Sequence, residues 1–311
     1  MTTKRNLADD LRVQREYLFH RFSRAIKATR YGRGRVNSTW LVRKESWEIV
    51  VRFYPPFFKE KLETEAWVLR ELNGYGGKVP RLLDIDTEGF STPVLFMSKL
   101  PGIPLRDRKR ALGAVSTKDL VGELRELLKF VATIPTSAYG YLHDPIIASD
   151  VADCARKASS RHLKTIKDNS LLPLEQIQVY ERSFELLQNL LVGREVQLTY
   201  PDLNSGNILL CEDRFSGLVD WEFVMGFEPL YGFANLILEL DSTDHRWASP
   251  TTILAVFPEP RQEELVLLTM FRGIELLSYL PTTVIFTRSE KKKWQYAYAR
   301  TLRKLQKLLG C

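Results

Sequence analysis

The chain is poor in the residues that build disulfide, zinc and serine-histidine sites. Its 311 residues include three cysteines, which lie far apart at 154, 211 and 311, and four histidines, which form no cluster. An odd number of distant cysteines argues against a disulfide framework, and their spacing is not that of zinc ligands. We therefore expect a reduced, cytoplasmic setting.

Long apolar runs are also missing. No segment has the roughly 20 apolar residues that a membrane-spanning helix needs, and the N-terminus lacks the apolar core of a secretory signal. Because 44% of the residues are apolar, the chain can still bury a large core. The sequence therefore predicts a globular protein of one bilobal domain or two domains, without a membrane span.

Positive charge is concentrated at the two ends. Residues 1–35 hold ten Lys or Arg against three Asp or Glu, and residues 288–311 hold eight against one, so each end carries +7 and the middle −7 within a total of +7. Apolar residues recur there at helical spacing and predict two amphipathic helices with basic outer faces: Leu7, Leu11, Leu18, Phe22, Ala25 and Thr29, then Trp294, Tyr298, Leu302, Leu305 and Leu309. Binding to a polyanion such as nucleic acid, and an Arg-rich organellar presequence, are the alternatives.

The most informative segment runs from Tyr200 to Glu222. It reads Tyr-Pro-Asp-Leu-Asn-Ser-Gly-Asn-Ile-Leu-Leu and, after a short polar turn, Ser-Gly-Leu-Val-Asp-Trp-Glu. Phosphoryl transfer requires a group that accepts the proton of the attacking hydroxyl and oxygen ligands for magnesium. Asp202, in a turn-rich loop, is the candidate base, and Asn207 and Asp220 are the candidate Mg2+ ligands.

A β-hairpin would bring these candidates together. Short apolar runs, Ile208 to Leu210 and Leu218 to Val219, flank the polar turn Cys211 to Gly217. Pairing of these runs would place Asp220 beside Asn207. The alternative is that the polar residues serve only as turn formers. An Asp-Leu-x-x-x-Asn that arose by chance would rarely be followed by an apolar hairpin ending in Val-Asp-Trp-Glu, so the hairpin argues against this alternative.

This segment resembles the catalytic core of the aminoglycoside phosphotransferase and choline kinase-like family, which is related to the protein kinases. The family pattern is His-Gly-Asp, then Asn, then Ile-Asp-Trp-Glu. The chain is similar at Asp202, Asn207, Asp220, Trp221 and Glu222, and differs at Tyr200 and Pro201, which replace His-Gly. The resemblance, over about residues 32–240, implies an α+β, bilobal protein kinase-like fold that uses ATP and Mg2+.

The resemblance implies that the first hundred residues form a small, β-rich lobe that clamps the nucleotide. The runs 40–42 and 47–53, separated by a charged turn, predict a hairpin. The preceding Gly32-Arg-Gly34 is similar to the family's Gly-rich loop, and Asn37 to the Asn of its Asn-x-Thr. By itself, a Gly-x-Gly between basic residues is more often a flexible linker, and its position just before the hairpin favours the loop.

A cation and a carboxylate are expected to hold the phosphates. The second strand ends at Val50-Val51-Arg52, and an amphipathic helix from about Lys59 to Asn73 follows it, stopped by glycines. By their positions in the fold that the resemblance implies, Arg52 stands where the family usually has Lys, and Glu65 is the carboxylate that braces Arg52. The alternative for Glu65 is a solvated helix carboxylate.

The next two apolar segments resemble the family's strand after the helix and its hinge strand. We place the hinge strand at Phe96 to Gly102, where the backbone of Phe96, Met97 and Ser98 would bind adenine and Met97 would pack against the base. The expected organisation is an N-terminal helix and lobe over 1–97, a hinge over 98–102 and a helical lobe over 103–311.

The second lobe is expected to be mainly helical. Ser116-Thr-Lys-Asp119 resembles a capping box ahead of a helix from Leu120 to Ile134, and 173–191 and 261–280 are further apolar-periodic stretches. Residues 225–234 resemble the family's Gly-Asp-Pro-x-x-Asp-Leu-Ala, with Glu228 and Gly232 in place of its two Asp. Because the second Asp normally braces the catalytic loop, we expect its loss, together with that of the loop histidine, to make the loop less rigid.

We therefore interpret the chain as an ATP-dependent phosphotransferase that acts on a hydroxyl of a small molecule. A catalytically silent binding module on the same fold is the alternative, given the changes at Tyr200, Arg52 and Gly232. A protein kinase is disfavoured because Asp-Phe-Gly and Ala-Pro-Glu are missing. The acidic middle of the chain is compatible with a cationic acceptor, but no motif identifies the acceptor.

Overall fold

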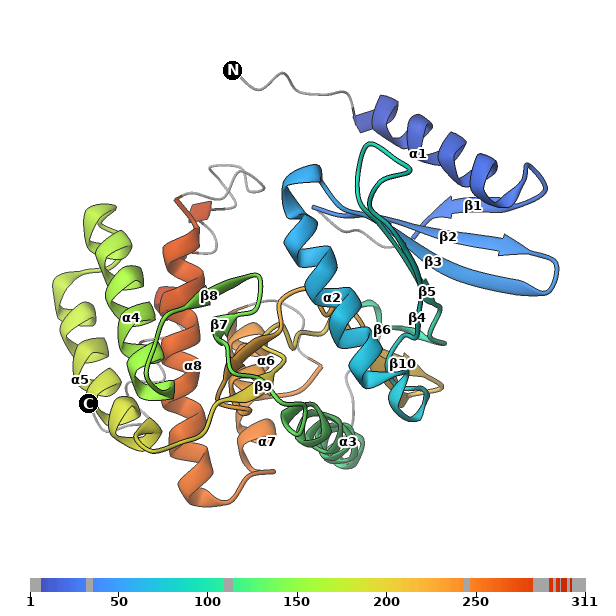
Figure 1. Ribbon diagram of the computed structural model, residues 1–311. Coiled ribbons are helices and arrows are strands. Elements are labelled where there is room, and N and C mark those ends of the chain that lie inside the picture. The colour runs from blue at the N-terminus through green and yellow to red at the C-terminus, as the bar shows by residue number, and fades with distance from the viewer. Residues whose placement is uncertain are drawn as a thin grey trace. The chain divides into compact units, whose positions relative to one another are not determined.

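The computed structural model describes residues 7–31, 36–108, 114–242, 247–281, 291–292, 295–296, 298–300 and 303 (Figure 1). The chain divides into two compact units, Met1–Leu100 and Pro101–Cys311. The first is rich in strands and the second is mainly helical, which confirms the predicted α+β class.

The first unit is built on a five-stranded antiparallel sheet. Its order is β1 (Lys27–Arg30), β2 (Ser38–Lys44), β3 (Trp47–Phe53), β5 (Val94–Ser98) and β4 (Leu82–Asp86). The predicted hairpin is β2–β3, with Leu41 opposite Val50 and a two-residue turn between the strands. Runs of β-branched and aromatic side chains favour these strands because both faces of the sheet carry buried residues.

Helix α1 (Leu7–Phe22) covers one face of this sheet. Leu18 is fully buried there and joins a cluster with Trp40, Phe53 and Phe96. Gln14 fixes the helix, because its Oε1 accepts hydrogen bonds from the Trp40 indole (2.8 Å) and the Ser38 hydroxyl (2.6 Å).

The predicted N-terminal helix is too long at its C-terminal end. Ser23 has a φ of +84°, which a right-handed helix does not allow, and α1 stops one residue before it. Thr29, predicted on the helix face with Ala25, lies in β1. The apolar pattern of residues 25–29 is too short to distinguish the 3.6-residue period of a helix from the two-residue period of a strand. Pairing with β2 makes residues 27–30 a strand.

Helix α2 (Lys59–Leu72) agrees with the prediction at both ends. It follows a short 3₁₀ turn, η1 (Pro56–Phe58), and ends where Asn73 takes a left-handed conformation and donates its N–H to the Leu69 carbonyl. Of the three glycines that were expected to stop the helix, Gly74 comes directly after Asn73, and Gly76 and Gly77 lie in a second turn, η2 (Tyr75–Gly77). The buried face of α2 includes Leu62 and Leu69 and also the carboxylate of Glu65.

The second unit combines six helices with two small antiparallel sheets among its described residues. Its elements are β6 (Ile103–Pro104), η3 (Leu105–Asp107), α3 (Ala114–Ala132), β7 (Tyr139–Tyr141), β8 (Asp144–Ile146), α4 (Val151–Asp168), α5 (Leu174–Leu191), β9 (Gln197–Thr199), β10 (Ile208–Cys211), β11 (Arg214–Leu218), β12 (Met225–Phe227), α6 (Tyr231–Ser242), α7 (Pro250–Leu254) and α8 (Glu259–Tyr279). The sheets have the orders β11-β10-β6 and β8-β7-β12-β9.

Helix α8 is the central helix of this unit and packs against α4, α5 and α6 (Figure 1). The predicted helices over 173–191 and 261–280 are confirmed as α5 and α8. The predicted capping box is wrong, since α3 already includes Ala114 and Ser116 therefore lies inside the helix. Helices α4 and α6 were not predicted from the sequence.

A buried ion pair lies on the inner face of α8. Arg272 Nη1 is 2.5 Å from Glu275 Oε2, and both side chains are almost fully buried. Glu275 also accepts hydrogen bonds from the hydroxyls of Tyr141 (2.9 Å) and Tyr231 (2.5 Å). Burial alone would raise the pKa of Glu275, but the charge of Arg272 and the hydrogen bonds from Tyr231 and Arg272 outweigh it and hold the pKa at about 2.

His162 of α4 is buried beside the same helix. Ser278 donates its hydroxyl proton to the Glu275 carbonyl, so the 2.8 Å contact between Ser278 Oγ and His162 Nδ1 requires the imidazole to donate. Burial lowers the pKa of His162 to about 4; Glu275 opposes this shift, and Arg161 and Arg272 add to it.

The start of α6 lies directly against the backbone at Tyr200. A Cβ atom at Gly232 would be 2.4 Å from the Tyr200 carbonyl oxygen, so only glycine allows this approach. By contrast, a Cβ at Gly122 in α3 would meet nothing within 4 Å.

Among the described residues, no helix combines the length and apolar character that crossing a membrane requires. Most of the C-terminal amphipathic segment predicted over 294–309 lies outside the described residues, as does the Gly32-Gly34 loop. The cytoplasmic setting remains a prediction.

We expect acidification to destabilise the protein through His162. Because its folded pKa of about 4 is below its ordinary 6.5, the unfolded state binds the proton first, and the free energy of unfolding falls as the pH drops from 6.5 to 4. The full loss is about 3 kcal/mol. Urea unfolding between pH 7.5 and 4 should show a shallower pH dependence for His162→Gln than for wild type. The exposed control His20→Gln should keep the wild-type slope, and equal slopes in all three proteins would contradict the assignment.

We expect Gly232→Ala to destabilise the protein by about 1–3 kcal/mol, because the new methyl group overlaps the Tyr200 carbonyl. Gly122→Ala should instead add about 0.5–1 kcal/mol, since alanine favours the helix interior. Urea denaturation of both variants measures the difference. Equal stability of the two variants would show that α6 does not approach residue 200 closely.

Candidate functional site

In the first unit, Arg52 and Glu65 form a buried ion pair. Arg52 Nη1 lies 2.8 Å and 3.1 Å from the two carboxylate oxygens of Glu65, and the two side chains are 9% and 0% exposed. The hydroxyl of Tyr54 donates to the same carboxylate. Glu65 is therefore not a solvated helix residue. Tyr54 was missed, although it lies two residues after Arg52, at the spacing of one strand face.

Strand register separates the predicted hinge residues. Met97 is opposite Val50 and Leu95 is opposite Arg52, so Met97 shares the sheet face of Arg52. The Phe96 side chain lies on the other face, in the core under α1. Ser98 uses its N–H and its Oγ in hydrogen bonds with the backbone of Arg81. Any contact of Phe96 with a nucleotide would therefore involve its backbone, as the hinge prediction supposes.

Asn37 lies half-buried just before β2, where the register continues with Thr39 opposite Arg52. The glycines expected to approach the phosphates lie outside the described residues. The first unit thus brings together Arg52, Glu65 and Met97 among the predicted nucleotide residues.

In the second unit, Asp202 and Asn207 lie in the loop between β9 and β10. The Asn207 Nδ2 donates to the Asp202 carboxylate (2.9 Å) and to its backbone carbonyl (3.0 Å). Asn204 Nδ2 donates to the same carbonyl at 2.8 Å. These short-range bonds curl the loop around Asp202 and fix the side chain of Asn207.

The predicted hairpin is β10–β11, with Ile208 opposite Leu218. It returns the chain to Asn207, whose carbonyl accepts the N–H of Val219 at 3.1 Å. Asp220, the next residue, has a φ of +71°, which turns the backbone sharply after the strand. The structure therefore brings Asp202, Asn207 and Asp220 into one site.

The environment of Asp202 disfavours its charged form. Burial, followed by the negative charge of Asp220, raises its pKa to about 7, while Arg272 and the two asparagine amides act in the opposite direction. A carboxylate with a pKa near neutrality suits a general base that takes up a proton and releases it again.

The donor set around Asp220 fits magnesium. Because the amide nitrogen of Asn207 is used by Asp202, its amide oxygen is the atom available to a metal. Asp220 adds a half-buried carboxylate, and an oxygen of the buried Glu222 lies within 4.8 Å of it. A typical Mg2+ site has a small number of protein oxygen ligands, and phosphate oxygens and water molecules complete the coordination.

The loop around Asp202 is braced by side chains that the sequence analysis missed. Asn235 donates to the Leu203 carbonyl at 3.0 Å and accepts from Arg272 Nε at 3.0 Å. Glu239 accepts from the N–H (2.7 Å) and the hydroxyl (2.6 Å) of Ser205. A signal was present, because Asn235 and Glu239 are polar residues four apart in the otherwise apolar segment 231–240.

Tyr200 supplies a further contact at the site where the family pattern has His. Its hydroxyl donates to the Val219 carbonyl at 2.7 Å, and its ring lies 4.6 Å from that of Trp221. Tyr200 therefore ties the start of the loop to the residue before Asp220.

The family model described as the phosphotransferase enzyme family (APH) matches residues 27–252. No curated protein matches the sequence.

Several solved aminoglycoside phosphotransferases share the fold. APH(2")-IIia in complex with GDP and kanamycin has a TM-score of 0.69 at 16% identity, over 94% of this chain and 98% of that one. APH(4)-Ia has a TM-score of 0.68 at 15% identity, over 94% and 98%. A thermostable mutant of APH(4)-Ia, in complex with AMP-PNP and hygromycin B, has a TM-score of 0.66 at 16% identity, over 93% and 97%.

At these identities the structural likeness shows the fold alone, which is the protein kinase-like fold expected from the sequence. The family match covers more than half of the chain and confirms the resemblance seen around Asp202. The chain belongs to the phosphotransferase enzyme family.

Proposed function

We propose that the protein transfers the γ-phosphate of ATP to a hydroxyl group of a small molecule. The observation that carries this proposal is the loop in which Asp202 and Asn207 are hydrogen bonded and Asp220 follows the returning strand. The family match and the complexes of the structural neighbours with AMP-PNP, hygromycin B or kanamycin support a small-molecule acceptor.

In this proposal, Asp202 orients the acceptor hydroxyl and takes its proton as the oxygen attacks the γ-phosphorus. The bond from the γ-phosphorus to the bridging oxygen breaks, and ADP leaves. Asn207 and Asp220 hold Mg2+, which when bound neutralises charge on the phosphates. The amide nitrogen of Asn207 also donates the hydrogen bond that orients the Asp202 carboxylate.

The Arg52–Glu65 pair is proposed to hold the α and β phosphates of ATP. Glu65 and Tyr54 fix the guanidinium, so that its fork is oriented before the nucleotide binds. Because a guanidinium binds phosphate in a planar, two-point manner, Arg is not equivalent here to the Lys it replaces.

We expect Asp202→Asn to lower phosphoryl transfer by about 10²–10⁴-fold, because the loop keeps its shape but loses the base. Mass spectrometry of phosphorylated product, with Mg-ATP and a panel of aminoglycosides, amine alcohols and sugars, measures the effect. The matched control is Asp168→Asn, an exposed carboxylate at the end of α4, which should leave the rate unchanged.

Unchanged transfer by Asp202→Asn would overturn the assigned role. A melting shift of the wild-type protein with Mg-ATP, but no transfer to any acceptor in the panel, would favour the silent binding module. No melting shift would contradict nucleotide binding itself.

We expect Arg52→Lys to fold and to bind Mg-ATP about tenfold more weakly, which is about 1.4 kcal/mol, since the charge remains but the fork is lost. Arg52→Ala should instead cost about 3–5 kcal/mol of stability, because it leaves the Glu65 charge buried without its partner. Titration of the melting shift with Mg-ATP measures the affinity. The control is Arg43→Lys, which changes an exposed arginine of β2 that pairs with Glu48. If Arg52→Lys bound Mg-ATP with wild-type affinity, Arg52 would not be part of the nucleotide site.

A further inference from the structure

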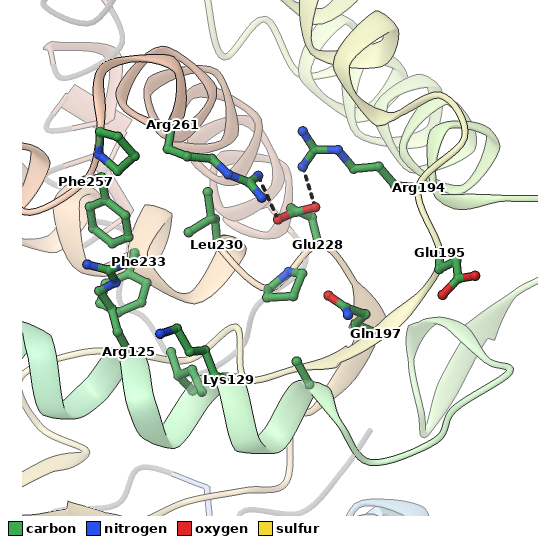
Figure 2. A pocket seen from close by; sticks show the side chains of 14 residues that line it. Arg125, Lys129, Arg194, Glu195, Gln197, Glu228, Leu230, Phe233, Phe257 and Arg261 are labelled. Carbon is green, nitrogen blue, oxygen red and sulfur yellow. Dashed lines mark hydrogen bonds and ion pairs between the residues drawn. The ribbon is translucent and has the colours of Figure 1, made fainter.

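The second unit contains a cavity of about 720 Å³ that the proposed catalytic residues do not line (Figure 2). It is bounded by α3, the segment leading into β9, the start of α6 and the residues just before and at the start of α8. A volume of this size accommodates a small organic molecule.

In the upper part of Figure 2, Arg194 and Arg261 are paired with Glu228. With Glu264, which lies behind the lining residues and is not drawn, they form a charge cluster that is internally balanced. Glu228 and Glu264 are buried, at 6% and 2% exposure. Arg194 pairs with both carboxylates, at 2.6 Å from Glu228, and Arg261 pairs with Glu264 at 2.6 Å and Glu228 at 3.6 Å. Two guanidinium groups thus compensate two carboxylates.

The opposite wall carries positive charge that is less well compensated. Arg125 donates to the Val256 carbonyl at 3.2 Å and lies 5.0 Å from the centre of the Phe257 ring. No carboxylate of the described part of the chain is within ion-pair distance of Arg125. Lys129, one helical turn further along α3, pairs only with the exposed Glu126 in these residues, and such a surface pair contributes little.

The rest of the lining favours an apolar group. The rings of Phe233 and Phe257 meet edge to face at 5.1 Å, and Leu128 and Pro229 continue this surface. Glu195 lies across the cavity from these rings and is exposed to solvent (Figure 2). Positive charge and an apolar wall are therefore adjacent in one cavity.

We propose that this cavity binds a small organic anion. Its phosphate or carboxylate group lies against Arg125 and Lys129. Its apolar part lies against the partly exposed Pro229 and Leu230, in the same wall as the buried rings of Phe233 and Phe257. A guanidinium that is already held by a ring and a carbonyl is preorganised for such a contact, since little side-chain freedom is lost on binding. Asp202, Asn207 and Asp220 do not line this cavity, so the proposed anion site does not depend on the proposed function.

The test is isothermal titration of the full chain with 1-naphthyl phosphate in the presence of saturating Mg-ADP, which occupies any nucleotide site. We expect binding that weakens at least tenfold in Arg125→Gln and also falls in Lys129→Gln. Arg182→Gln removes the same charge from an exposed position of α5 and should bind as wild type. A parallel titration with 1-naphthoate tells whether phosphate or carboxylate is preferred, and binding of either one with this dependence on Arg125 supports the site.

Three results would overturn the proposal. Equal affinity of Arg125→Gln and wild type would place the anion elsewhere. Equal affinity for neutral naphthalene-1-methanol would remove the role of charge, and equal affinity for inorganic phosphate would remove the role of the apolar wall. Circular dichroism of each variant, compared with wild type, identifies any loss of binding that comes from misfolding.

Discussion

The position of Arg272 on α8 is the constraint on which the site in the second unit depends. Its guanidinium compensates the buried Glu275, binds the Tyr141 hydroxyl and orients the Asn235 amide. Asn235 in turn holds the Leu203 carbonyl, next to Asp202. Removing Arg272 would leave Glu275 buried without its counter-charge and release Asn235, so core stability and loop geometry share one side chain.

The changes from the family pattern are compensated together. A side chain at residue 232 would overlap the Tyr200 carbonyl, so no brace can start from there. Asn235 and Glu239, one and two turns along α6, contact Leu203 and Ser205 instead, and Tyr200 contacts Val219. The loop that carries Asp202 and Asn207 is therefore fixed on both sides, as the proposed catalytic role requires.

The sequence predicted what local patterns encode. The hairpins β2–β3 and β10–β11 and the helices α2, α5 and α8 follow from apolar periodicity and turn residues, and the proximity of Asp202, Asn207 and Asp220 follows from the second hairpin. The end of α1 depends on the pairing of β1 with β2, and the start of α3 lies ahead of a false cap at Ser116. The bracing of the loop and the cavity beside Arg125 arise from contacts between distant segments, which no periodicity reports.

The central claim is that the chain of contacts from Arg272 through Asn235 keeps the loop around Asp202 rigid. Amide hydrogen exchange in wild type and Asn235→Ala tests it most directly, because exchange measures local opening. We predict exchange at Ser205 and Asn207 at least about tenfold faster in the variant, with α5 unchanged as an internal control. Equal protection of the loop amides in both proteins would contradict the account.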